Sequence, residues 1–157
     1  MATVKYPDRL PLPQRASQNM TQDTGFKTIQ PAVGPAIFTG LTSDLKSTWS
    51  LTWIFTLREA QVFKSWLRSP TYCNNGINWF EIAIDLGDMQ GPQIQLVHFT
   101  SMPVQTSKDG MTVTWTASVI CNGLNDQVKD YDDWLVEAPV GYEDWLDPLV
   151  TVILPEA

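Results

Sequence analysis

Paired carboxylates are the residues of this sequence with the most obvious chemical potential. Asp132 and Asp133 form one pair, Glu143 and Asp144 a second, and Asp147 follows closely. Two carboxyl groups fixed in a cleft, one with a raised pKa, can hydrolyse a glycosidic bond. Adjacent carboxylates, however, point in different directions on most backbones, and acidic segments are usually solvated. We therefore expect a charged surface here, and no catalytic site.

The same region is rich in oxygen ligands of the kind that calcium prefers. They are Asn125, Asp126, Asp130, Asp132 and Asp133. The alternating Asp/Asn spacing and glycine of a calcium-binding loop are absent. We expect a charged loop and no metal site.

The remaining candidates for chemistry are single residues. His98 is the one histidine, and Cys73 and Cys121 are the two cysteines. The sequence contains no Cys-x-x-Cys, His-x-x-x-His or Gly-x-Gly-x-x-Gly motif. We expect a histidine in the core or at an interface, no cofactor, and a protein that is not an enzyme. The cysteines are either paired or free, and a reducing cytoplasm favours free thiols.

The charge of the chain is unevenly distributed. Its 157 residues are 43% hydrophobic and 17% charged, with a net charge of −7. Residues 1–70 carry a net +4, and residues 71–157 a net −11. The two halves either neutralise each other within one fold or orient copies that pack head to tail. The acidic total argues against sequence-specific nucleic-acid binding, and no apolar run reaches the roughly 20 residues of a membrane span.

Residues 1–46 are expected to form an extended, proline-rich arm. Pro7, Pro11 and Pro13 exclude a helix interior or a central strand. The segment nevertheless carries too much apolar surface for a solvated linker, which favours an arm lying along its own domain or along a neighbour. Its apolar residues include Tyr6, Leu10, Leu12, Phe26, Ile29, Val33, Ile37 and Phe38.

Residues 47–121 are expected to form a compact β-rich domain with one helix. Strict alternation predicts a half-buried strand over 48–56. Thr56 and Glu59 have the spacing of a capping box, which begins a helix over 57–69. The apolar face of that helix contains Ala60, Phe63, Trp66 and Leu67.

Three further strands follow the helix, over 77–87, 93–101 and 111–121. The sequence predicts hairpin turns between them, the clearest at Asp109-Gly110. The fold class is therefore α+β and mainly β. We expect an antiparallel sheet packed on the amphipathic helix, or alternatively a sandwich extended by strands from the arm.

Residues 122–157 form an acidic, aromatic C-terminal segment. Residues 131–135 (YDDWL) recur as residues 142–146 (YEDWL), eleven positions later. Tryptophan in an acidic segment needs a surface that buries it, either the domain's own core or a neighbouring subunit.

Several stretches in this order resemble small neck and tail structural proteins of tailed bacteriophages. They are YP…LPLP near the start, W-x-L-x-W, EAQVFKSWL, GINWFEI, VHFT and G-x-x-x-T-W, spread over residues 5–121. The acidic segment departs from that pattern. The resemblance implies a virion protein, assembled in the bacterial host cytoplasm, that forms a ring or repeated array and joins other neck or tail proteins.

The expected function is therefore that of a virion structural protein of the head–tail connection or tail, without membrane association. The residues expected to contact neighbours are Tyr6, Pro7, Leu10, Leu12, Tyr131, Trp134, Tyr142 and Trp145. An alternative is a carbohydrate- or host-receptor-binding module of the virion, in which Trp134 and Trp145 stack on sugar rings. A third hypothesis, a small hydrolase, would use Asp133 and Asp144.

Overall fold

The computed structural model describes residues 3–87, 91–123 and 132–139. Its contacts divide the chain into two units, Met1–Asn125 and Asp126–Ala157. The first unit contains the sheet and its helix. In the second unit, the described residues include the short helix α2 (Asp132–Glu137).

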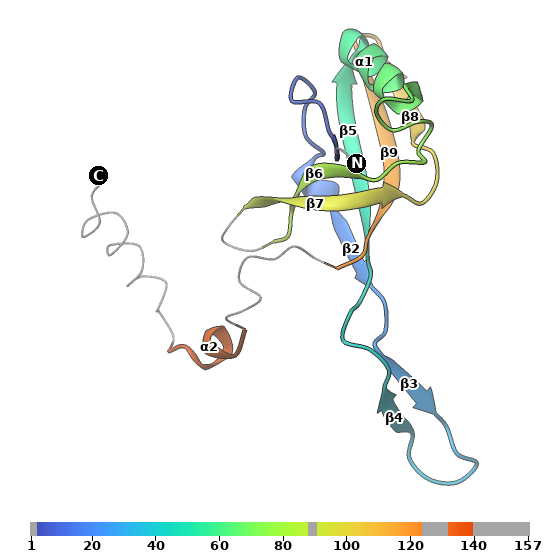
Figure 1. Ribbon diagram of the computed structural model, residues 1–157, viewed down its shortest axis with the longest axis vertical. Coiled ribbons are helices and arrows are strands. Elements are labelled where there is room, and N and C mark those ends of the chain that lie inside the picture. The colour runs from blue at the N-terminus through green and yellow to red at the C-terminus, as the bar shows by residue number, and fades with distance from the viewer. Residues whose placement is uncertain (1–2, 88–90, 124–131, 140–157) are drawn as a thin grey trace. The chain divides into compact units, whose positions relative to one another are not determined.

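Two long strands form the centre of the sheet. β5 (Ser47–Thr56) and β9 (Thr112–Cys121) pair antiparallel along their whole length, from Ser47 opposite Cys121 to Thr56 opposite Thr112. Figure 1 shows them side by side, with β6 and β7 crossing them. Along β5 the buried and outward positions alternate, because successive side chains of a strand point to opposite faces. This confirms the sequence prediction for both strands.

Seven strands in the described residues form one sheet, in the order β1-β6-β7-β9-β5-β2, and β8 adds to the side of β9. The remaining bounds are β1 (Val4–Lys5), β2 (Asn19–Gln22), β6 (Phe80–Asp85), β7 (Pro92–Phe99) and β8 (Val104–Asp109). β1 runs parallel to β6, and the other pairs are antiparallel. The fold is α+β and mainly β, with a mixed sheet where the sequence predicted an antiparallel one.

The helix α1 (Leu57–Arg68) begins where the sequence predicts and ends one residue earlier. The Thr56 hydroxyl accepts a hydrogen bond from the Glu59 amide at 3.4 Å. The Glu59 carboxylate accepts one from the Thr56 amide at 2.8 Å. These reciprocal bonds complete the capping box and satisfy two amides that the helix itself leaves without acceptors.

The core is an aromatic cluster between α1 and the sheet. Phe63 is fully buried, and its ring centroid lies 4.9 Å from that of Phe55, 5.4 Å from Trp53 and 5.5 Å from Trp115. The four apolar helix positions predicted from spacing, among them Phe63 and Trp66, are all buried. The sheet therefore packs its tryptophan-rich face on the helix, as the sequence predicts.

Residues 1–46 differ from the single extended arm expected from the sequence. β1 and β2 belong to the main sheet, and η1 (Arg15–Ser17) is a short 3-10 turn between them. Tyr6 donates a hydrogen bond to the Pro11 carbonyl at 2.6 Å, and its ring packs edge-on against Trp66. The Leu10 amide donates to the Pro7 carbonyl at 3.1 Å and closes a turn in this stretch. Among the described residues before β5, the part that forms a sheet of its own is β3–β4.

Two other expectations differ from the structure. β8 was not anticipated, because VQTSKD has no apolar alternation and all six residues are exposed. β6 begins at Phe80, three residues later than expected, since the chain from Thr71 to Gly76 is a tight turn that continues toward Trp79. The turn expected around residues 87–92 includes positions outside the described residues.

Candidate interaction surfaces

A β-hairpin continues the β2–β5 pair beyond the edge of the sheet. Its strands, β3 (Phe26–Ile29) and β4 (Ile37–Gly40), pair with each other in a separate two-stranded sheet. At its base the Asp23 amide donates to the Lys46 carbonyl at 3.0 Å, and the Leu41 amide donates to the Gly25 carbonyl at 2.8 Å. Figure 1 shows this β3–β4 hairpin extending past the ends of β2 and β5, at the end of β5 opposite α1.

The β3–β4 hairpin carries large apolar side chains on both of its faces. Phe26 and Phe38 lie on one face, with ring centroids 5.6 Å apart. Ile29 and Ile37 are directly paired on the other face. All four are exposed, Phe38 by 64% and Ile37 by 54%. An isolated two-stranded hairpin is marginally stable in water, so this apolar surface is suited to a partner.

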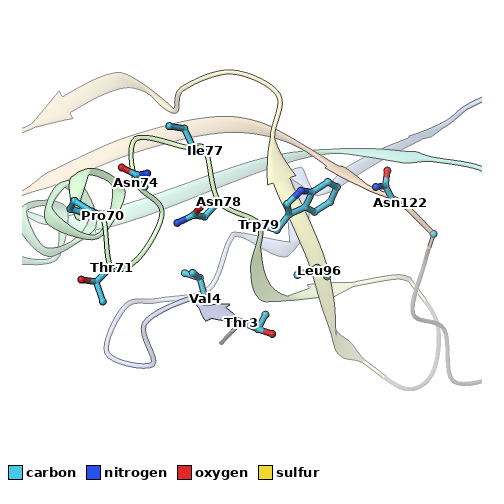
Figure 2. Close-up of a pocket in the computed structure, with 11 residues that line it drawn as sticks. Thr3, Val4, Pro70, Thr71, Asn74, Ile77, Asn78, Trp79, Leu96 and Asn122 are labelled. Atoms are coloured by element: carbon cyan, nitrogen blue, oxygen red, sulfur yellow. The ribbon is translucent and has the colours of Figure 1, made fainter. Parts of the chain in front are cut away.

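A cavity of about 750 Å³ lies elsewhere in the same unit, at the side of the sheet. Four separate segments surround it: β1, the loop after α1, β7 and the end of β9 (Figure 2). The described residues that line it include no charged side chain. They are Thr3, Val4, Pro70, Thr71, Asn74, Ile77, Asn78, Trp79, Leu96, Asn122 and Gly123.

The loop that forms one wall of this cavity is held by its own backbone. Cys73 is buried beneath the loop, and its amide donates to the Trp66 carbonyl of α1 at 3.3 Å. The side-chain amide of Asn78 donates to the Tyr72 carbonyl at 2.7 Å. Asn74 and its successor Asn75 have φ of 50° and 56°, values that asparagine tolerates better than most residues. The loop is therefore fixed before any ligand arrives.

Trp79 lines the cavity and rests against His98. Their ring centroids lie 5.2 Å apart, and the Trp79 side chain stays 36% exposed. Both nitrogens of His98 face carbonyl oxygens, that of Phe99 at 2.7 Å and that of Ile77 at 2.9 Å. The histidine therefore acts as a link between β7 and the loop, in agreement with a structural role.

The outer side of β7 is more apolar than its inner side. Ile94 and Leu96 point outward and are 59% and 48% exposed, whereas Gln93 and Gln95 are buried. Val97 is opposite Phe80 in the core, and the two-residue period of a strand then places the glutamines inward. Leu96 contributes to the neutral cavity, and Ile94 to a smaller hollow beside Tyr6.

The two cysteines are free and buried. Burial raises the pKa of the Cys73 thiol to about 12. Burial also raises the pKa of Cys121, whose thiol donates a hydrogen bond to the Gly123 carbonyl at 2.9 Å. Neither thiol is suited to nucleophilic chemistry, because the reactive form is the thiolate.

The carboxylates singled out in the sequence form no described site. Asp132 and Asp133 are exposed at the start of α2. No group of three or more His, Cys, Asp or Glu side chains positioned for a metal ion occurs among the described residues. Asn125, Asp126, Asp130, Glu143, Asp144 and Asp147 lie outside the described residues.

The residues expected to contact neighbours differ in their exposure, and some lie outside the described residues. Tyr6 and Leu10 are 7% and 4% exposed, so the structure assigns them to the core of their own unit and corrects their place in a contact surface. Pro7 is half-buried, and Leu12 is exposed. Trp134 is 52% exposed on α2. Tyr131, Tyr142 and Trp145 lie outside the described residues.

The sequence analysis did not predict the cavity, and it did not include the apolar residues of the β3–β4 hairpin among those expected to contact neighbours. Phe26 and Phe38 stood out only as apolar residues in a proline-rich stretch, and no signal marked Trp79 and Asn122 as neighbours in space.

Comparisons with protein-family models, curated proteins and solved structures found no match to this chain. In the part of the chain that the structure describes, no helix is long and apolar enough to cross a membrane.

Proposed function

We propose that this chain is a structural subunit of a bacteriophage neck or tail, which acts by self-association and by joining other virion proteins. The observation that carries the self-association is the β3–β4 hairpin with exposed apolar side chains on both faces. The bacteriophage assignment rests on the sequence resemblance over residues 5–121. In this role the protein resides in the virion after assembly in the host cytoplasm.

The hairpin is suited to bind a neighbouring chain by strand pairing, because each of its strands has one unpaired edge in the described residues. β3 and β4 have no strand partners in the described residues other than each other. An exposed strand edge offers amides and carbonyls to another chain, while the apolar side chains supply contact area. Together these features favour a second copy or another virion protein as the occupant.

The segregated charge of the chain supports head-to-tail packing. The basic first part and the acidic second part of the sequence are complementary in charge, and such complementarity fixes orientation more than it adds affinity. Salt weakens such an interaction between exposed charges. Assembly driven by the hairpin and oriented by charge should therefore depend on salt only in part.

Light scattering of the purified protein at low and high salt tests this proposal. We expect a closed oligomer at low salt, and negative-stain electron microscopy should show rings. The variant I37S/F38S should be monomeric. Because neither residue belongs to the core cluster, the variant should still fold, with a far-UV circular dichroism spectrum that matches that of the wild type.

A matched control removes two exposed apolar residues elsewhere, one in β8 and one in the turn between β8 and β9. Val104 and Met111 are 58% and 78% exposed, so V104S/M111S should assemble like the wild type. A wild-type monomer at every concentration and both salts, or an I37S/F38S oligomer of unchanged mass, would refute the proposal.

The alternative function, a carbohydrate- or host-receptor-binding module, was placed by sequence on Trp134 and Trp145. Of these, Trp134 is half-exposed on α2, and Trp145 lies outside the described residues. The feature of the structure that favours ligand binding is instead the neutral cavity beside Trp79.

A further inference from the structure

We infer that the cavity beside Trp79 is a binding site for a neutral saccharide. This inference is independent of the proposed self-association, because no residue of the β3–β4 hairpin lines the cavity. It is also independent of Trp134 and Trp145. It rests on the size, the charge, the polar groups and the aromatic ring of the cavity.

The size of the cavity matches a small ligand. Its volume of about 750 Å³ falls within the range of roughly 300–1,000 Å³ typical of small-molecule sites. Its walls come from four segments that lie together in the structure without a ligand. Figure 2 shows the side chains of these segments, with Asn78 among them. A preformed site avoids much of the ordering cost of binding.

The described lining offers no counter-charge to a charged ligand. Among the described residues around the cavity there is no Lys, Arg, His, Asp or Glu to pair with a phosphate, a carboxylate or an ammonium group. A charged ligand would lose its hydration without gaining a counter-charge. Nucleotides, amino acids and acidic sugars are therefore poor candidates.

The polar groups of the lining match hydroxyl groups. Three residues with side-chain amides and two with hydroxyls contribute, namely Asn74, Asn78, Asn122, Thr3 and Thr71. Amide and hydroxyl side chains both donate and accept hydrogen bonds, as sugar hydroxyls do. The Asn78 amide already donates to the Tyr72 carbonyl, but a hydrocarbon ligand such as an acyl chain would offer no hydrogen bond to the other four residues, which is costly.

Trp79 supplies the apolar surface that the C–H face of a sugar ring requires. Its indole is held against His98, and His98 is held by the Ile77 and Phe99 carbonyls. A fixed, partly exposed aromatic ring beside amide and hydroxyl groups combines apolar contact with directional hydrogen bonding. Leu96 and Val4 extend the apolar part of the lining.

The test is a two-dimensional ¹H–¹⁵N NMR titration of the full-length protein. The probes are the methyl glycosides of glucose, galactose, mannose and N-acetylglucosamine, with methyl glucuronide as the charged counterpart of methyl glucoside. We expect at least one neutral glycoside to shift the Trp79 indole N–H and the Asn122 side-chain amide saturably. Methyl glucuronide should bind at least about tenfold more weakly than methyl glucoside, because its carboxylate finds no counter-charge in the cavity.

Variants locate the site. W79A should abolish binding, and T71V, which keeps the shape of the side chain but loses its hydroxyl, should weaken it about tenfold. W134A removes an exposed tryptophan that does not line the cavity and should leave binding unchanged. The urea midpoint of T71V should equal that of the wild type, so a folding defect in W79A would not hide the result.

Three outcomes would overturn the inference. The first is the absence of a saturable shift with all four neutral glycosides. The second is binding that survives W79A and T71V or disappears in W134A. The third is a Trp79 shift that follows protein concentration instead of glycoside, since a second copy of the chain would then fill the cavity.

Discussion

Gly25 and Thr42 approach each other so closely at the base of the β3–β4 hairpin that residue 25 has no room for a side chain. A Cβ atom on Gly25 would lie 2.7 Å from the Thr42 carbonyl oxygen and 2.8 Å from Cδ2 of Leu45. The Gly25 carbonyl in turn accepts from the Leu41 and Thr42 amides, at 2.8 and 3.3 Å. The absence of a side chain thus allows the hairpin to leave the sheet in register.

We therefore predict that G25A loosens the base of the hairpin. The backbone must shift to accept the methyl group, at a cost of about 1–3 kcal/mol. The Leu41 and Thr42 amides should exchange their hydrogens faster, as measured by NMR, while the urea midpoint of the core changes little. G40A is the matched control, because a Cβ there meets nothing within 4 Å. Equal exchange in the two variants would contradict the prediction.

Phe63 should contribute more to stability than any exposed residue of α1. It is fully buried, and its ring contacts those of Phe55, Trp53, Trp66 and Trp115. F63A should lower the free energy of unfolding by about 3–5 kcal/mol, measured by urea denaturation. Q61A, on the exposed side of the same helix, should change it by less than about 0.5 kcal/mol. A small effect of F63A would mean that the aromatic cluster is not the core.

Tyr6 should make the protein sensitive to alkali. Burial, reinforced by the Glu59 carboxylate, raises the pKa of Tyr6 far above its usual value. Below about pH 10 both the folded and the unfolded state keep this proton; above it, only the unfolded state loses it. The contribution of Tyr6 to stability is thus complete below about pH 10 and decreases as the pH rises, by up to about 1.4 kcal/mol per pH unit.

The variant Y6F isolates this contribution. It lacks the hydrogen bond to the Pro11 carbonyl and should be about 1 kcal/mol less stable than the wild type at pH 8. Above pH 10 the difference should shrink and then reverse, because phenylalanine does not ionise. Urea denaturation from pH 8 to 11 measures both curves, and parallel curves would show that Tyr6 ionises normally in the folded state.

Cys73 should resist alkylation as long as the protein is folded. With its pKa raised to about 12, the thiol forms about a thousandfold less thiolate at pH 8 than an exposed cysteine does. Iodoacetamide should therefore label Cys73 only after denaturation, as peptide mass spectrometry can establish. The variant S101C places a thiol at an exposed position and should react at the ordinary rate. Equal labelling of Cys73 and of the introduced thiol in the folded S101C variant would refute the assignment of a buried thiol.

The elements predicted correctly from the sequence are those whose signals are local. The capping box of α1 needs only Thr56 and Glu59, and the burial pattern of β5 follows from strict alternation. The Asp109-Gly110 signal correctly marked a hairpin turn, but the strand that the turn joins to β9 is β8 and not the strand predicted over 93–101. β8 itself was not predicted, because its six residues are all exposed and show no apolar alternation that would indicate its pairing with β9.

β7 shows what composition alone leaves open. Its alternation is visible in the sequence, but which face is buried depends on register with β6. Because Val97 pairs with Phe80, Gln95 points into the core and Leu96 points outward. Polarity alone would favour the opposite arrangement. Only the neighbouring strand decides this.

The sequence by itself determined the mainly β fold class, the amphipathic helix α1 and the apolar character of residues 26–38, because these depend on short-range spacing. Tertiary structure decided which apolar residues stay exposed. Tyr6 and Leu10 enter the core by pairing of β1 with β6, whereas Phe26 and Phe38 leave the sheet on the β3–β4 hairpin. It likewise brought Trp79 and Asn122, 43 positions apart in the chain, to one cavity. Such neighbours arise from strand pairing between distant segments, which no local pattern encodes.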